Sequence, residues 1–149
     1  MSKVYFWKNF KKLNGTAKRL LADFYPAKSE LLIKIHFGEP GNDFALSPED
    51  IKPFIDTLKQ KKIKITFIDT PVAYSSLRNT VRGYEKTARE KGWSKLGNIL
   101  ICNRFSRVKT KNFIAEVCHG LVESPNVLVI SHVKGHACSG FGGAIKNLG

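Results

Sequence analysis

The sequence is poor in cysteine, in acidic residues and in long apolar runs. No apolar stretch approaches the roughly 20 residues of a membrane-spanning helix, so no membrane partner is expected. Segment 4–7 is too short and too aromatic to be a signal peptide. The three cysteines, Cys102, Cys118 and Cys138, are odd in number and scattered. We therefore expect no disulfide framework and a cytoplasmic location.

The apolar content is sufficient for one folded domain. The 149 residues are 42% hydrophobic and include 10 phenylalanines. A chain of about 150 residues can bury roughly 70% of its unfolded surface. These values exclude a disordered basic tail and predict a single domain over residues 1–149.

Apolar spacing alternates between the periods of strands and helices. Runs rich in β-branched residues predict strands at 31–37, 63–68, 99–102 and 127–130, with an edge strand at 4–7. Helical patterns cover residues 17–24, 51–58, 79–91 and 119–123. Segment 108–117 fits either a strand or a helix. The alternation predicts an α/β fold with a mostly parallel sheet and helices on both faces, a Rossmann-like three-layer arrangement.

Local signals fix the ends of two helices. Ser47 can cap the second helix, and Pro48 suits its first position. Gly92 is expected to end the third helix in a left-handed conformation. A final helix is expected to begin near Gly140, with little chain after it. We therefore expect the N-terminal part of a longer domain, incomplete at its C-terminus, or a domain that a second chain completes.

Reactive side chains follow the first two predicted strands. In open parallel sheets, ligands bind beyond the carboxyl ends of the strands. The first strand leads to His36 and Glu39, and the second leads to Asp69, Tyr74 and Arg78. We expect these residues to contribute to a ligand site at one edge of the sheet.

The richest segment follows the last predicted strand. It combines two imidazoles and two ammonium groups with glycines, namely His132, Lys134, His136, Gly140, Gly142, Gly143 and Lys146. Glycines let backbone N–H groups approach a ligand, and a helix N-terminus attracts phosphate or carboxylate. The two lysines add positive charge to such a site. The expected partner is therefore a small anionic ligand.

Two chemical roles are open for the histidines of this segment. In a cationic site His132 or His136 would be neutral at pH 7 and could act as a general base. Alternatively, His132, His136 and Cys138 offer donors that zinc or nickel accepts, with one position open. The absence of a Cys-x-x-Cys motif means that this chain alone cannot assemble an iron–sulfur cluster.

The same residues carry a resemblance to a known family. The segment Lys34 to Asn42, then Asp69-Thr70 with Tyr74 and Arg78, then His132 to Asn147, resembles the family called domain of unknown function 362. The resemblance runs in order over about residues 31–149. It implies an enzyme or redox-linked protein. Members are usually longer and often carry a ferredoxin-type iron–sulfur module, which supports the expectation that this chain is part of a longer domain.

A more distant resemblance concerns mechanism. The His136 to Lys146 segment is similar to one in the nickel-pincer lactate racemases, where a histidine is followed ten residues later by a lysine. That resemblance implies that His136 is the catalytic acid/base and that Lys146 anchors a nickel–pyridinium nucleotide. The sequence leaves open whether the cofactor is a nucleotide or a metal.

The formal net charge of +13 favours a competing hypothesis, a nucleic-acid-binding module. Arg104, Phe105, Arg107, Lys109 and Lys111 form a basic, partly alternating stretch that could line one face of a strand. No recognition helix, zinc finger or oligonucleotide-binding signature accompanies it. A third hypothesis is a non-catalytic subunit that docks on a second chain.

Overall fold

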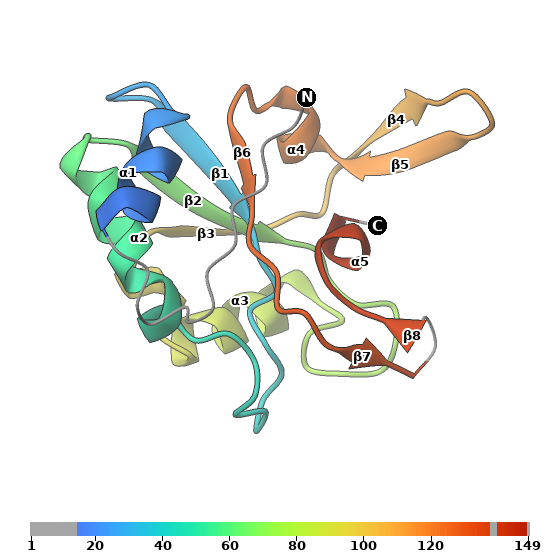
Figure 1. Cartoon of the computed structure of the whole chain (residues 1–149). Coiled ribbons are helices and arrows are strands. Elements are labelled where there is room, and N and C mark those ends of the chain that lie inside the picture. The colour runs from blue at the N-terminus through green and yellow to red at the C-terminus, as the bar shows by residue number, and fades with distance from the viewer. Residues whose placement is uncertain (1–14, 138–139, 149) are drawn as a thin grey trace.

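A computed structural model describes residues 15–137 and 140–148 of the chain (Figure 1). The predicted edge strand 4–7 and Cys138 lie outside these residues. Four parallel strands form the central sheet, β1 (Glu30–Lys34), β2 (Lys64–Asp69), β3 (Asn98–Ile101) and β6 (Val127–Val129). They follow the four predicted strand runs, and the predicted α/β fold class is confirmed.

The strand order is β3-β2-β1-β6. β1 pairs with β2 on one side and with β6 on the other, both in parallel register. The chain thus extends the sheet in one direction through β3 and then crosses to the opposite side of β1. In open parallel sheets, the crevice at such a reversal is the usual ligand position.

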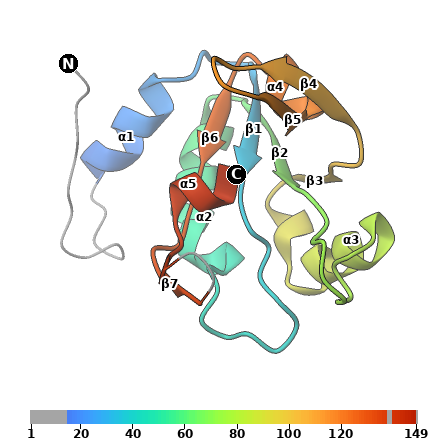
Figure 2. The same cartoon turned by 90° about the vertical axis from the view of Figure 1, so that its right-hand side faces the viewer.

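One face of the sheet carries the larger core and three helices, α1 (Gly15–Asp23), α2 (Pro48–Gln60) and α3 (Val81–Glu90) (Figure 2). The predicted cap of α2 is confirmed and is a capping box. The backbone N–H of Asp50 donates to Ser47 Oγ, and the N–H of Ser47 donates to Asp50 Oδ2. These bonds satisfy backbone donors at the start of the helix.

The short 3-10 helix η2 (Trp93–Lys95) follows α3 and delivers the largest fully buried side chain of this core. Gly92 has φ 85°, which confirms the predicted left-handed turn after α3. The Trp93 ring lies edge-on to Phe37 and Phe67, with centroids 5.8 and 5.6 Å away. Trp93 therefore packs against both the segment that follows β1 and the middle of β2.

The opposite face of the sheet is covered more thinly. Its buried cluster consists of Leu32, Ile68, Cys102 and Cys118. It is covered by the five-residue helix α4 (His119–Glu123) and by a hairpin of β4 (Phe105–Lys109) and β5 (Ile114–Cys118). The hairpin projects away from the sheet (Figure 1). Segment 108–117, open between strand and helix in the sequence, thus falls largely in this hairpin.

A disulfide joins Cys102 to Cys118, with 6.1 Å between their Cα atoms. The expectation that the cysteines form no disulfide is therefore wrong for this pair. The hairpin folds back on itself, so that it brings the end of β5 beside the end of β3. Because disulfides are typical of oxidising environments, the cysteine count no longer supports a reducing compartment.

The C-terminal segment differs from the predicted helix. Gly140–Phe141 forms strand β8, which pairs antiparallel with β7 (Gly135–His136), and α5 (Ala144–Leu148) begins only afterwards. Gly143, with φ 133°, makes the turn into α5. Among the described residues, no helix is both long enough and apolar enough to cross a membrane.

Candidate functional site

A buried ion pair lies at the carboxyl ends of the two central strands. Lys34, the last residue of β1, places its Nζ 2.6 Å from Oδ1 of Asp69, the last residue of β2. The same carboxylate accepts the N–H of Thr70 at 2.9 Å and the hydroxyl of Tyr84 from α3. Burial, together with the charge of Asp69, raises the pKa of Tyr84. Tyr84 is therefore a hydrogen-bond donor to Asp69 at neutral pH.

Asn147 of α5 lies between the ends of β1 and β6. Its Oδ1 accepts from Lys34 Nζ at 2.9 Å, and its Nδ2 donates to Ile130 O at 3.1 Å and to Ser131 Oγ at 3.0 Å. The C-terminal segment is thereby bonded to both strands at the point where strand order reverses. Sequence reasoning missed Lys34 and Asn147 as site residues; a lysine within an apolar strand was the available signal.

A second cluster surrounds Arg78, whose side chain is fully buried. Its Nη1 lies 2.9 Å from His36 Nε2, and its Nη2 donates to Glu39 Oε1 and to the Tyr74 hydroxyl. The guanidinium also lies over the Tyr84 ring, 5.3 Å from its centroid. Arg78 thus connects this cluster to the ion pair, and the predicted residues His36, Glu39, Asp69, Tyr74 and Arg78 form one continuous group.

Both ring nitrogens of His36 face hydrogen-bond donors. The N–H of Gly38 lies 3.0 Å from Nδ1, and Arg78 Nη1 approaches Nε2. A neutral imidazole has one nitrogen that accepts and one that carries hydrogen, so it can satisfy only one of these donors. His36 is an exposed residue, but partial desolvation of its ring by the surrounding protein lowers its pKa, and the Arg78 charge lowers it further, against the opposing charge of Asp69. The ring is therefore neutral at pH 7.

Glu39 is the single carboxylate in contact with the Arg78 guanidinium among the described residues. Tyr74 donates its hydroxyl to Glu39 Oε1 at 2.9 Å. That hydrogen bond holds the pKa of Glu39 below its usual value, and Arg78, His36 and Lys134 lower it further. Burial and the bond to Glu39 raise the pKa of Tyr74. Because β6 runs parallel to β1, the loop that carries Lys134 leaves the sheet at this same edge.

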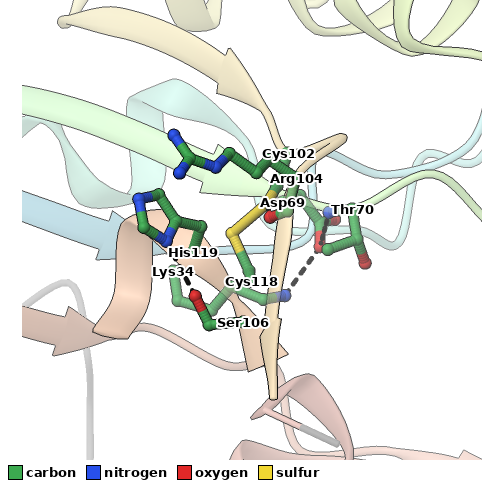
Figure 3. Close-up of a disulfide and its surroundings, with 8 residues drawn as sticks. All are labelled: Lys34, Asp69, Thr70, Cys102, Arg104, Ser106, Cys118 and His119. Atoms are coloured by element: carbon green, nitrogen blue, oxygen red, sulfur yellow. Dashed lines mark hydrogen bonds and ion pairs between the residues drawn. A yellow bond between two sulfur atoms is a disulfide. The ribbon is translucent and has the colours of Figure 1, made fainter. Parts of the chain in front are cut away.

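The disulfide lies beside the ion pair (Figure 3). The N–H of Cys102 donates to the backbone oxygen of Asp69 at 2.8 Å. On the Cys118 side of the disulfide, the next residue, His119, places its Nδ1 2.7 Å from Ser106 Oγ. The covalent link therefore holds the base of the hairpin against the strand end that carries Asp69.

The histidines of the C-terminal segment lie in other surroundings. His132 lines a hollow of about 460 Å³ between residues 43–46 and 130–133. His136 is part of β7, and no described contact joins either ring to His36. The roles of His132 and His136 as general base stay predictions. In the described part of the chain, no three His, Cys, Asp or Glu side chains are grouped to hold a metal ion. The predicted donor set includes Cys138, outside that part.

The glycines of this segment shape the turn into α5. The N–H of Gly142 donates to the backbone oxygen of Lys134 at 2.7 Å, and the oxygen of Gly143 accepts from the N–H of Asn147 at 2.9 Å. A Cβ on Gly142 would lie 3.3 Å from Lys134. Lys146 is exposed on α5, and Gly140 is exposed in β8. The predicted role of these residues in cofactor binding stays a prediction.

The fold and the site define a parallel α/β domain with a cluster of paired charges at the carboxyl ends of its strands. The chain belongs to the family described as "Domain of unknown function (DUF362)", which matches residues 31–149. A comparison with curated proteins gave no match, and neither did a comparison with solved structures. The predicted family is confirmed; the likeness to lactate racemases has no support beyond the sequence segment itself.

Proposed function

We propose that the domain binds a small anionic ligand at the carboxyl ends of β1 and β2, with Arg78 as its main cationic partner. The observation that carries the proposal is a surplus of hydrogen-bond donors. Arg78 Nε is buried and has no hydrogen-bond partner among the described residues. His36 cannot accept from both Gly38 and Arg78 at once. The cluster therefore has more donors than acceptors.

An anion would relieve that shortage. Buried donors without partners destabilise a folded protein, and such groups call for a specific explanation. Carboxylate and phosphate oxygens accept several hydrogen bonds and match the planar donor edge of arginine. Lys134, which acts electrostatically on Glu39, adds positive charge at the rim. Together these groups favour a negatively charged ligand over a neutral or cationic one.

The test is a binding measurement on the whole chain with three anions of different shape: acetate, inorganic phosphate and adenosine monophosphate. Calorimetry and native mass spectrometry should detect binding of at least one. Arg78→Lys, which keeps the charge but loses the planar fork, should weaken that binding at least about tenfold. Tyr74→Phe is a second variant that should also weaken binding. Tyr74 is largely exposed, so loss of its hydroxyl should leave folding intact.

Arg89→Lys is the matched control. Arg89 pairs with Glu85 on the exposed side of α3, with 2.6 Å between Nη2 and Oε1. The control should bind the anion as the wild type does. The proposal is overturned if the wild type binds none of the three anions at millimolar concentration. It is also overturned if Arg78→Lys and Tyr74→Phe both bind the anion as tightly as the wild type does.

The second candidate function is nucleic-acid binding by the hairpin. The structure places Arg107 and Lys109 on the same side of β4 as the half-exposed Phe105, and a two-stranded ribbon can enter a major groove. Glu116 lies opposite Arg107 in β5 and offsets part of this charge. Affinity that falls steeply with salt and is lost in Arg107→Ala/Lys109→Ala, but not in Arg78→Lys, would support this candidate.

A further inference from the structure

The carboxylate of Glu39 occupies the position at which a ligand would meet Arg78. Arg78 is fully buried, whereas the Glu39 side chain, which covers it, is 50% exposed. One carboxylate oxygen of Glu39, Oε1, thus accepts from both Arg78 Nη2 and the Tyr74 hydroxyl.

We propose that Glu39 is an internal stand-in for the ligand and that the ligand carries a carboxylate group, which replaces Glu39 on Arg78 and Tyr74. The inference rests on the proposed anion site and names the class of anion. A ligand carboxylate reproduces the charge and the planar shape of the group that it replaces, so the buried guanidinium stays neutralised throughout. One of its oxygens takes the place of Glu39 Oε1, and its second oxygen accepts from the unpartnered Arg78 Nε. A phosphate would bring a tetrahedral group into contacts that now fit a planar one.

The backbone around Glu39 is suited to release of its side chain. Glu39 begins a tight turn in which the N–H of Asn42 donates to Glu39 O at 3.1 Å. Gly38 precedes the turn and Gly41 lies within it, both with positive φ (83° and 72°). A Cβ on Gly41 would meet nothing within 4 Å. Because the turn tip is exposed, the carboxylate can rotate into water without moving β1.

The exchange also distinguishes Glu39 from the other carboxylate of the site. Asp69 is bonded to Lys34, Thr70 and Tyr84, and its side chain is only 7% exposed. Because Asp69 is buried and has three partners, we expect it to stay in place when a ligand enters. Glu39 has one cationic partner and open solvent on its other side.

The experiment compares the wild type with Glu39→Gln for binding of acetate and of inorganic phosphate. Glutamine keeps the size of the side chain but removes its charge, so it competes less well for Arg78. Acetate affinity should rise roughly tenfold in Glu39→Gln. Glu30→Gln is the control, since Glu30 also forms an ion pair, with Lys64 at 3.5 Å, but at the opposite end of β1. Its acetate affinity should equal that of the wild type.

The outcomes separate this inference from the proposed function. If the wild type binds acetate and Glu39→Gln binds it equally or more weakly, Glu39 belongs to the binding surface and the stand-in role is wrong. A preference for phosphate over acetate in both proteins also overturns the inference while the anion site stands. If neither protein binds either anion, the proposed function itself fails.

Discussion

Lys34 and Asp69, 35 residues apart in the sequence, form a buried ion pair with 2.6 Å between Nζ and Oδ1. Their side chains are only 8% and 7% exposed. A buried charge is costly unless a partner compensates it, so each residue requires the other. The pair joins the ends of β1 and β2, from which the loops bearing His36 and Arg78 begin. The ion pair is thus the base on which the anion site is built.

Asp69→Asn should therefore lower the free energy of unfolding by about 3 kcal/mol, because it leaves the Lys34 ammonium without its anionic partner. Urea unfolding followed by circular dichroism measures the change. Asp56→Asn is the control, since Asp56 pairs with Lys52 on the exposed side of α2. Exposed pairs contribute at most about 1 kcal/mol. A loss below that value for Asp69→Asn would show that the ion pair is not needed.

The Cys102–Cys118 disulfide should stabilise the domain by about 3 kcal/mol, because it links two residues separated by 16 positions and so closes a loop in the unfolded chain. Thermal unfolding with and without a thiol reductant tests this value. Under denaturing, non-reducing conditions one thiol per chain should react with a chromogenic disulfide, and three after reduction. Three reactive thiols before reduction would show that the bond does not form.

Acidification should destabilise the domain through His36. The pKa of His36 in the folded state is below its usual value, chiefly through partial desolvation of its ring. The stability that depends on neutral His36 is fully present above the unfolded value near 6.5. It is lost as the pH falls from there through the folded pKa. His36→Gln should flatten the pH dependence of unfolding in this range. A His36 ring that titrates in NMR spectra at or above 6.5 would contradict this account.

Gly83→Ala should disturb the loop that carries Arg78, although Gly83 is not itself a residue of the candidate site. A Cβ at this position of α3 would lie 2.0 Å from the backbone oxygen of Leu77, which directly precedes Arg78. The loop must shift, and we expect both a loss of about 2 kcal/mol in stability and weaker anion binding. Gly135→Ala, where a Cβ meets nothing within 4 Å, should change neither. Unaltered anion binding by Gly83→Ala would contradict the prediction.

The strands, the helix caps and the sheet edge that carries the site could be predicted from the sequence because their signals are local. Ser47 and Gly92 act within one or two turns of their own helices. His36 and Arg78 are 42 residues apart, yet both follow parallel strands, whose carboxyl ends meet at one edge. Their contact therefore follows from the order of strands rather than from any pairing visible in the sequence.

Other features depend on contacts that no local pattern encodes. The disulfide forms because the hairpin returns Cys118 to the end of β3, and segment 108–117 is ambiguous between strand and helix. The glycines near Gly140 also favour a helix start, yet the pairing of β7 with β8 delays the helix to Ala144. The strand pattern does not show why a charged Lys34 is tolerated in an apolar strand. The reason is its contacts with distant residues, an ion pair with Asp69 and a hydrogen bond to Asn147.

The most direct test of the anion site is an NMR measurement on the Arg78 guanidinium. Its buried Nε–H has no hydrogen-bond partner in the described part of the chain. Addition of acetate or phosphate to saturation should shift the Arg78 guanidinium resonances downfield and slow their exchange with water, while those of the exposed Arg89 stay unchanged. Arg78 resonances that do not move, with the anion bound elsewhere on the protein, would contradict the account.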